Sequence, residues 1–153
     1  MTQEMRRKDR QLTEAAAKQI LEQGEYGILS TADEAGIPYG VPISYAFQNN
    51  TIYFHCAKDT GLKAANIASQ PQVCFTVVGK TKVLPEKFST LYESAIAFGT
   101  ARKAADKRVG LTLLQEKYSP GLSEAGIQYI EQSLNHVEVY EIEIESLTGK
   151  GRN

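Results

Sequence analysis

The residues best suited to chemistry follow one another closely between positions 52 and 63, in the run Ile-Tyr-Phe-His-Cys-Ala-Lys-Asp-Thr-Gly-Leu-Lys. The pattern predicts a buried strand that leads through a short loop into a helix beginning near Thr60. Free N–H groups at a helix start attract anions, and the Thr60 hydroxyl adds a further polar group. Lys63 would lie in the first helical turn, where a positive charge is unfavourable for the helix dipole. We therefore expect Lys63 to have an anionic partner such as a phosphate, with Lys58 contributing from the loop.

Each of these residues also has a purely structural interpretation. Thr60 can be a plain helix cap and Lys63 a solvated lysine. His55 lies between two apolar neighbours in the predicted strand. Such a histidine is either a satisfied core or interface residue, or a proton donor or electrophile that faces a ligand. His136 is expected to be exposed or structural, and two histidines are too few for a histidine-based metal cluster, so we expect no metal site.

The stretch from Ile37 to Phe47 has the most regular pattern in the chain. Its odd positions are large and apolar or aromatic and its even positions are small or rigid: Ile37, Tyr39, Val41, Ile43, Tyr45 and Phe47 alternate with Pro38, Gly40, Pro42, Ser44 and Ala46. This alternation predicts one long strand. Pro38 and Pro42 lack N–H groups on the same side, which indicates a sheet edge or a bulge. The small face would let a flat molecule lie against the backbone. The alternatives are an ordinary edge strand and an edge packed by another subunit.

Periodicity and turn residues predict the remaining elements. They are a helix that Thr13 caps and Gly24 ends, strands over 26–32, 51–57, around 73–77 and around 95–99, helices over 60–69, 104–118 and 123–134, a polar loop over 79–90, and a final strand over 137–147. The apolar parity of the final strand changes near Tyr140, which predicts a bulge or burial on both faces. Because most strands follow one another through short turns, the pattern favours a closed antiparallel barrel with helices added.

Length and charge bound the class of protein. The chain has 153 residues, which fits a single domain over 1–153. Seventeen Lys and Arg against eighteen Asp and Glu give a net charge of −1, which argues against a nucleic-acid partner. No apolar run approaches a membrane span and no signal peptide is recognisable, so we expect a cytoplasmic protein with no membrane partner. Residues 1–10 are polar and basic. We expect them to form a flexible arm, or an arm that folds over an acidic ligand or a partner subunit.

Several common site types lack their motifs in this sequence. Cys56 and Cys74 lie outside any Cys-x-x-Cys pair, so we expect buried thiols and neither a disulfide framework nor a zinc site. The sequence also lacks the Gly-x-Gly-x-x-Gly of dinucleotide-binding folds, the Gly-x-x-x-x-Gly-Lys phosphate loop and the Gly-x-Ser-x-Gly nucleophile elbow.

Four segments together resemble the nitroimidazole-resistance family. They are Met5–Arg10, Gly36–Tyr45, Ile52–Ala57 and Gly61-x-Lys63, and the similarity continues to Ile142-Glu143-Ile144 and Lys150. That family belongs to the FMN-binding split barrels related to pyridoxamine 5'-phosphate oxidase. The resemblance implies a mainly β fold with added helices, an antiparallel FMN-binding split β-barrel, and a homodimer with two FMN sites at the subunit interface.

The same resemblance assigns individual residues to the cofactor. It implies that Pro42, Ile43, Ser44 and Tyr45 border the flavin ring and that His55 lies beside the flavin as the catalytic residue. It also implies that Thr60 and Lys63 bind the cofactor phosphate. The implied cofactor-binding set is completed by Ala57, Lys58 and Gly61.

One functional hypothesis and two alternatives follow. The main hypothesis is an FMN-dependent reductase that passes electrons to a small planar acceptor, such as a nitroaromatic compound, with His55 as the proton donor. The first alternative is a flavin- or haem-binding or sensing module without turnover. The second is a cofactor-free barrel that acts only through protein contacts.

Overall fold

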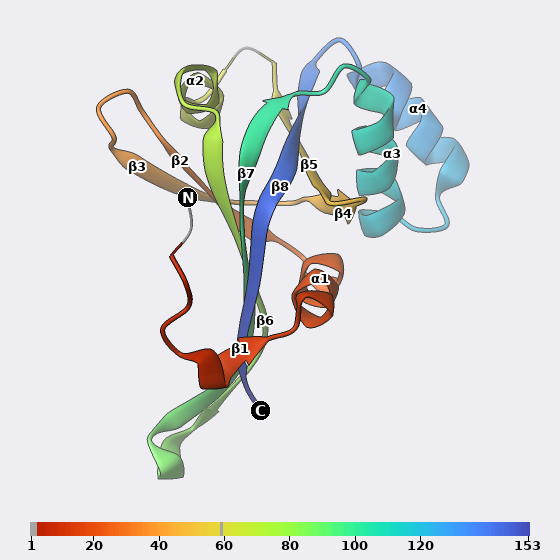
Figure 1. The fold of residues 1–153 in the computed structure, drawn as a ribbon. Helices are drawn as coiled ribbons and strands as arrows, with labels where there is room; N and C mark the ends of the chain where they lie inside the picture. Colours follow the sequence, from red (N-terminus) through yellow and green to blue (C-terminus); the bar gives the residue numbers. More distant parts are fainter. Residues whose placement is uncertain (1–2, 59) are drawn as a thin grey trace.

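The computed structural model describes residues 3–58 and 60–153, so the first two residues of the expected arm lie outside it, as does Asp59. Strands dominate, and helices are attached to them (Figure 1). In chain order the elements are η1 (Lys8–Arg10), β1 (Gln11–Leu12), α1 (Glu14–Gln23), β2 (Gly27–Ala32), β3 (Pro38–Ile43), β4 (Ala46–Gln48), β5 (Thr51–Ala57), α2 (Leu62–Ser69), β6 (Gln72–Leu84), η2 (Pro85–Lys87), β7 (Ser89–Lys103), α3 (Lys107–Tyr118), α4 (Ser123–Ser133) and β8 (Val137–Arg152). Within the described ranges, none of these helices is long and apolar enough to cross a membrane.

The strands form one antiparallel sheet in the order β3-β2-β6-β7-β8-β5-β4, with β1 added on β8. The two ends of this path, β3 and β4, are consecutive in the chain and are joined only by Ser44 and Tyr45. The prediction of a closed barrel is therefore wrong, and the split barrel implied by the family resemblance is confirmed. Because β3 pairs with β2 without interruption, Pro38 and Pro42 must direct their donor-free nitrogens to the open edge, which discourages a further strand there.

The strand predicted over 37–47 is broken in two. β3 ends at Ile43, and Tyr45 turns into the interior, where its side chain is fully buried, before β4 begins at Ala46. The alternation holds within β3, where Pro38, Gly40 and Pro42 are exposed and the residues between them are half-buried. The period-two pattern thus reports the faces of the strand, but not the bend at Ser44 that carries the chain from one end of the sheet to the other.

The main core lies on the concave side of the sheet, under α1. Its largest buried side chains are Tyr45, Phe54, Phe75, Leu21 and Leu29. The predictions for α1 are confirmed: the Thr13 hydroxyl accepts a hydrogen bond from the N–H of Ala16 at 3.2 Å, and the helix ends at Gly24. Gly24 is required for close packing, because a Cβ atom there would lie 2.5 Å from the Tyr45 hydroxyl.

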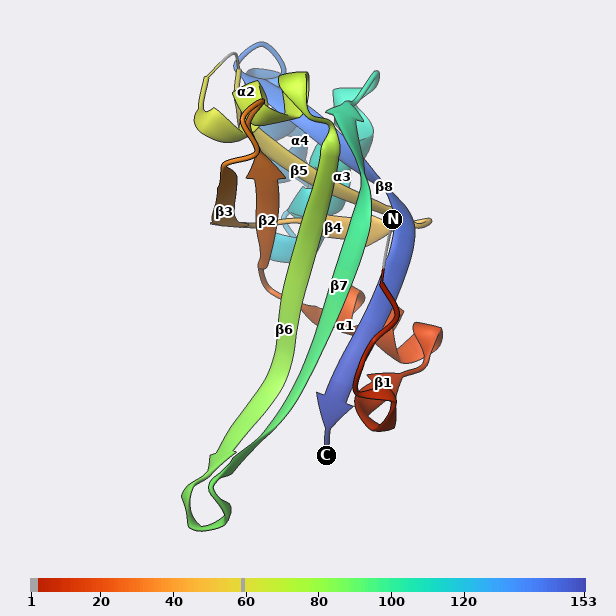
Figure 2. The same ribbon diagram turned by 60° about the vertical axis from the view of Figure 1, so that its left-hand side comes forward.

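The polar loop predicted over 79–90 does not exist as a loop. β6 and β7 continue through this region as a paired hairpin closed by η2, and Figure 2 shows that it extends well beyond the rest of the sheet. We name this hairpin, residues 79–93, the arm; it is distinct from the N-terminal arm that was predicted over residues 1–10. Its two strands satisfy each other's backbone hydrogen bonds without a buried face, so the apolar alternation that marks a core strand is absent.

The helices α3 and α4 agree closely with the sequence patterns, whereas the final strand continues five residues beyond the predicted end at Leu147, to Arg152. α3 and α4 pack side by side against the far end of the sheet (Figure 1), over a small second core of Ala104, Leu111, Ile130 and Val139. In β8, Glu138, Val139 and Tyr140 are all buried, which confirms the predicted burial on both faces. The bulge lies further along, where the register with β7 shifts at Glu145.

Candidate functional site

His55 stands on the side of β5 that faces α3 and α4. Ile52 and Phe54 point into the main core, and His55 belongs to the opposite face, opposite Val139 of β8. Its Nδ1 atom is fully buried and has no hydrogen-bond partner among the described residues. Burial lowers the pKa of His55, and the positive charge of Lys63 lowers it further. His55 is therefore neutral at pH 7. Within residues 3–58 and 60–153 its Nδ1 lacks the hydrogen bond of a satisfied core histidine, and its role as an interface residue or as a group that faces a ligand stays a prediction.

The start of α2 has the features expected of an anion site, except that Thr60 does not cap the helix. The helix begins at Leu62, its N-cap is Gly61, and no side chain caps it. The Thr60 hydroxyl donates to the Ala57 carbonyl at 3.4 Å, so the interpretation of Thr60 as a helix cap is wrong. Gly61 has φ of +94°, which favours glycine, and a Cβ atom there would meet nothing within 4 Å. The first-turn N–H groups of α2 are thus open on one side.

Lys63 lies in the first turn of α2 and is half-buried. Among residues 3–58 and 60–153, no carboxylate lies within ion-pair distance of its ammonium group. Its charge lowers the pKa of both His55 and Cys56, which places it close to the end of β5. The anionic partner expected from the sequence is therefore not supplied by the described part of the chain.

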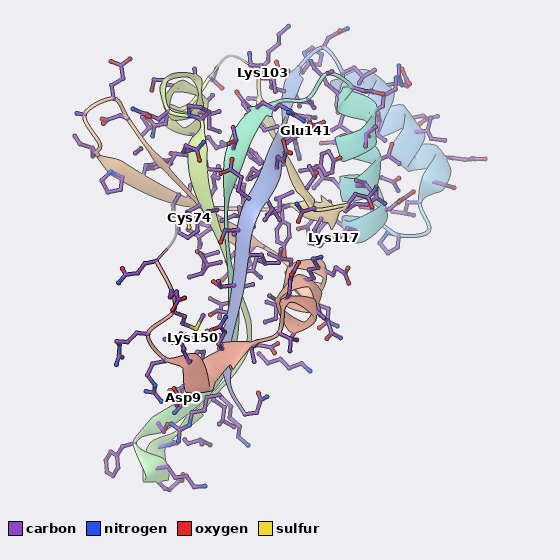
Figure 3. All side chains as sticks on the ribbon, in the orientation of Figure 1. Asp9, Cys74, Lys103, Lys117, Glu141 and Lys150 are labelled. Atoms are coloured by element: carbon purple, nitrogen blue, oxygen red, sulfur yellow. The ribbon has the colours of Figure 1, made fainter. Side chains whose placement is uncertain are left out.

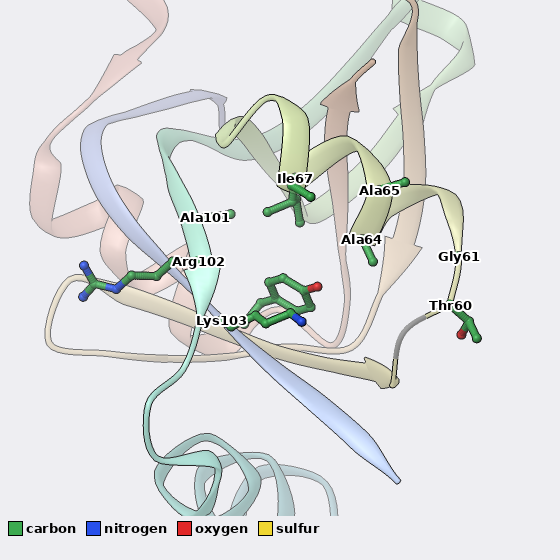
Figure 4. Close-up of a pocket in the computed structure, with 10 residues that line it drawn as sticks. Thr60, Gly61, Ala64, Ala65, Ile67, Ala101, Arg102 and Lys103 are labelled. Carbon is green, nitrogen blue, oxygen red and sulfur yellow. The ribbon is translucent and has the colours of Figure 1, made fainter. Parts of the chain in front are cut away.

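A cavity of about 500 Å³ lies beside the start of α2. Thr60 and Gly61 form one side, small residues of α2 form another, and Lys103 and Tyr140 come from the adjacent sheet. Figure 4 shows the Lys103 side chain lying within the cavity, whereas the Arg102 guanidinium points away from it, toward Glu141 and Glu143. We call this the α2 cavity. No sequence pattern links Lys103 to this site, because it follows Thr60 by more than 40 positions.

A second cavity, of about 590 Å³, lies between β5 and the pair α3–α4. Ser44 and His55 line it from the sheet side, and Leu114, Tyr118 and Tyr129 line it from the helices. We call this the helix-covered cavity. Two of the residues predicted for the site, Ser44 and His55, are therefore brought together here, while Thr60 and Gly61 lie in the α2 cavity.

The remaining predicted residues lie around these cavities. Pro42 is exposed on the open edge and Ile43 packs against the core. Ala57 and Lys58 are exposed at the end of β5, where the Lys58 N–H donates to the His136 carbonyl at 3.1 Å. The side chain of Tyr45 is not brought to either cavity, because it lies in the core and its hydroxyl donates to the Leu21 carbonyl at 2.5 Å.

Two residues at the end of α3 hold the bend between β3 and β4. The Tyr118 hydroxyl accepts from the Tyr45 N–H at 3.0 Å and lies 2.5 Å from the Glu25 carbonyl. The Lys117 ammonium donates to the Tyr45 carbonyl at 2.8 Å and lies 3.7 Å from the centre of the Tyr45 ring. Figure 3 shows Lys117 at this junction. Burial lowers the pKa of Lys117 to about 8. No sequence pattern links these residues to a partner some 70 positions earlier.

Both cysteines are free and half-buried, and burial raises the pKa of each thiol. Cys74 lies on the outer face of the sheet (Figure 3), opposite Phe98 in the register of β6 and β7. The expectation of fully buried thiols is therefore corrected to half-buried ones. Neither thiol is activated, because a raised pKa leaves little thiolate at pH 7.

Solved structures share this architecture over most of their length. A candidate 5-nitroimidazole antibiotic resistance protein from Bacteroides thetaiotaomicron is 23% identical, with a TM-score of 0.73 over 92% of this chain and 86% of that chain. The flavocytochrome Anf3 from Azotobacter vinelandii is 19% identical, with a TM-score of 0.78 over 99% of this chain and 73% of its own. A protein from Mycobacterium smegmatis that binds FAD and haem is 18% identical, with a TM-score of 0.78 over 94% and 74%. These similarities establish the fold.

No curated protein is significantly similar to the chain in sequence. The sequence profile of the family described as pyridoxamine 5'-phosphate oxidase, in contrast, matches residues 13–151. The match runs from the cap of α1 to the end of β8 and includes every predicted site residue. The split-barrel topology and this nearly complete match together show that the chain belongs to the pyridoxamine 5'-phosphate oxidase family.

Proposed function

We propose that this protein binds FMN and acts as a reductase that passes electrons to a small planar acceptor such as a nitroaromatic compound. The observation that carries the proposal is the buried Nδ1 of His55, which has no hydrogen-bond partner within residues 3–58 and 60–153 and lies near the positive charge of Lys63. A buried polar atom without a partner is costly, and it is tolerated most often where a ligand or a reaction uses it.

The α2 cavity fits the phosphate of the cofactor. The uncapped start of α2 offers N–H groups and carries Lys63 in its first turn, and Lys103, which also lies 3.9 Å from a Glu138 carboxylate oxygen, lines the cavity from the sheet. Helix N-termini combined with cations favour phosphate groups. Gly61 keeps the approach open, because no side chain stands before the first turn.

The exposed edge of β3 suits the flat ring of the cofactor. Pro42 and Gly40 present little side-chain bulk, and this edge has no further strand beside it. Ser44 stands at the bend between this edge and the helix-covered cavity. Backbone and small side chains can therefore lie close to a planar molecule on this side of the sheet.

His55 would serve the acceptor by hydrogen bonding and proton donation. Burial and Lys63 favour its neutral form, in which one ring nitrogen carries the proton. The neutral ring therefore offers one N–H donor and one lone pair, and the N–H would donate to an oxygen of the acceptor.

The proposed reaction balances as a two-electron reduction. FMN, when bound, would supply the two electrons, and a reduced nicotinamide dinucleotide would be their source. A nitro group takes up two electrons and two protons and yields a nitroso group and water. His55 delivers one proton and recovers it from solvent, and solvent provides the second.

A second candidate function is a flavin- or haem-binding module without turnover. It is favoured by the names of two similar structures, a flavocytochrome and a protein that binds FAD and haem. The two functions differ in one assay, because a binding module takes up cofactor and fails to oxidise NADH or NADPH with any acceptor.

We also propose that the protein is a cytoplasmic homodimer with the cofactor at the subunit interface. An uncharged patch on the outer face of the sheet supports the dimer, since Val78, Ile96 and Phe98 are exposed there side by side on β6 and β7. We call it the outer patch. The two free thiols fit a reducing compartment.

The first experiment is the visible spectrum of the purified protein, followed by mass analysis of any released chromophore. We expect flavin bands and the mass of FMN. The second is turnover with NADPH or NADH and a nitroaromatic compound. His55→Ala should keep FMN and lose turnover by a factor on the order of 10² to 10⁴, the range for a general acid.

A Thr60→Ala, Lys63→Ala double variant tests the phosphate site. We expect its FMN affinity to fall by about tenfold or more, because a charge-assisted contact to the phosphate is removed. Lys87→Ala is the matched control, because this lysine is exposed in η2, at the closed end of the arm, and belongs to neither cavity. A protein that takes up neither FMN nor another flavin would refute the proposed function.

A further inference from the structure

The helix-covered cavity has a lining that differs in kind from that of the α2 cavity. Its lining residues come from β5, the β3–β4 bend, α3 and α4, and none of them is Asp, Glu, Lys or Arg. We propose that this cavity is the acceptor site and that it selects uncharged, flat aromatic molecules. The inference rests on the proposed function, because it assigns the second substrate of that site.

The distribution of charge separates the two ligands. The α2 cavity is lined by Lys103 and by the start of α2, whose first turn carries Lys63, so a phosphate gains favourable contacts there. A phosphate or carboxylate in the helix-covered cavity would lose its hydration without a Lys or Arg side chain among the described lining residues to pair with it. The cofactor phosphate therefore belongs to the α2 cavity, and a charged acceptor is disfavoured in the helix-covered cavity.

The walls of the helix-covered cavity suit a flat aromatic molecule. Leu111 and Leu114 of α3 supply apolar surface, and Tyr118 and Tyr129 supply aromatic rings against which a planar ligand can stack. Leu122 and Tyr129 are each 57% exposed at its mouth, although apolar side chains of this size are normally covered. The volume of about 590 Å³ lies within the range of small-molecule sites.

The polar groups of the cavity define the chemical class further. His55 contributes its imidazole ring and Ser44 contributes a hydroxyl, and both come from the sheet side. A ligand that suits the apolar walls and can also accept a hydrogen bond from these two polar groups carries an oxygen acceptor at one end of an uncharged ring, as nitroaromatic compounds and quinones do. His55 then lies between the acceptor and the charge of Lys63, which links the helix-covered cavity to the cofactor site.

The test uses a matched pair of acceptors and a matched pair of variants. The acceptors are 4-nitrobenzyl alcohol and 4-nitrobenzoate, which differ chiefly in charge. Ala125→Phe places a ring in the cavity from α4, whereas Ile127→Phe changes an exposed residue of the same helix that does not line it. All measurements use FMN-loaded protein, and the melting temperature of each variant establishes that it is folded.

We expect KM for 4-nitrobenzyl alcohol to be about tenfold or more below that for 4-nitrobenzoate, since the carboxylate must be desolvated without a partner. Ala125→Phe should raise KM for the alcohol by about tenfold or more and leave FMN affinity unchanged. Ile127→Phe should change neither quantity. Direct binding of 4-nitrobenzyl alcohol, measured by the shifts of the His55 imidazole signals in NMR, should be lost in Ala125→Phe as well.

Three outcomes would overturn the inference. One is an unchanged KM in Ala125→Phe, which would place the acceptor elsewhere. Another is loss of FMN binding in that variant, which would mean that the cofactor itself occupies the helix-covered cavity. The third is equal KM for both acceptors. Failure of the wild type to bind FMN would instead refute the proposed function, and the NMR measurement of 4-nitrobenzyl alcohol binding would still report on the cavity.

Discussion

His55 has a buried ring nitrogen without a hydrogen-bond partner in the described part of the chain, and a positive charge lies near it. Burial disfavours the imidazolium ion, and Lys63 disfavours it again through charge repulsion. An anion bound at Lys63 would remove the second effect. The pKa of His55 is therefore coupled to occupancy of the α2 cavity, so cofactor binding and the protonation of the proposed proton donor favour each other.

We predict that Lys63→Ala raises the pKa of His55, because the repulsive charge is removed while the imidazole stays buried. Adding FMN to the wild type should raise it too. The measurement is an NMR titration of the imidazole signals. Lys58→Ala provides the control, since Lys58 does not contribute to the shift of His55. A His55 pKa that is insensitive to Lys63→Ala would show that burial alone sets it.

Lys117 gives a second prediction at this scale. Burial lowers its pKa from 10.5 to about 8, so between these values the unfolded chain binds more protons than the folded protein. The contribution of Lys117 to the free energy of unfolding therefore rises with pH across that window. Urea unfolding at pH 7.5 and 9.5 should show the wild type gaining stability relative to Lys117→Met. An equal change in the free energy of unfolding of the wild type and of Lys117→Met between the two pH values would contradict the lowered pKa of Lys117.

At the level of elements, β7 and β8 lie so close together at their register shift that no side chain larger than that of glycine fits at Gly99. A Cβ atom on Gly99 would lie 2.2 Å from the backbone oxygen of Glu143. We predict that Gly99→Ala lowers the free energy of unfolding by about 1–3 kcal/mol, as overpacking typically does. Gly40→Ala is the control, because its Cβ would meet nothing closer than 3.5 Å on the edge strand β3. Equal free energies of unfolding for the two variants in denaturant would show that the β8 backbone moves to accommodate the added methyl group.

Most elements could be predicted from the sequence because their signals are local. Thr13 and Gly24 delimit α1, strict alternation identifies β3, and apolar stripes locate α3 and α4. The arm was missed because pairing between two polar strands needs no apolar pattern. The bend at Ser44 was missed because Tyr118 and Lys117 hold it from the far end of α3, and such long-range contacts leave no trace in local periodicity.

The candidate site was predictable in part for the same reason. His55, Thr60, Gly61 and Lys63 lie within nine positions, so one motif contains them all. Lys103 and the aromatic residues of the helix-covered cavity come from distant segments, and only the fold brings them near. The family resemblance could imply the cofactor residues. It could not indicate that these residues would border two cavities, one with a lysine in its lining and one without charged lining residues.

At the scale of the whole molecule, the outer patch is the surface that a second copy is proposed to cover. Phe98 is 42% exposed and Ile96 is 36% exposed on strands whose other face is fully packed. We predict that Phe98→Glu produces a monomer and lowers FMN uptake, because the charges would be buried against the partner. The measurement is sedimentation velocity with and without FMN.

Phe88→Glu is the matched control, since Phe88 at the tip of the arm is 97% exposed and far from the outer patch. It should leave the dimer intact. A Phe98→Glu protein that remains a dimer with full FMN uptake would locate the interface elsewhere, and dissociation by Phe88→Glu alone would assign it to the arm.

The position of β8 in the sheet also determines when the fold can be completed during synthesis. β8 separates β3-β2-β6-β7 from β5-β4 and pairs with β1 as well, yet it emerges from the ribosome after all of them. Until then the nascent chain holds two separate sheets, and the facing edges of β5 and β7 remain open to strands of other chains. The interval before β8 is released is therefore the stage at which this protein is most exposed to aggregation and most in need of a chaperone.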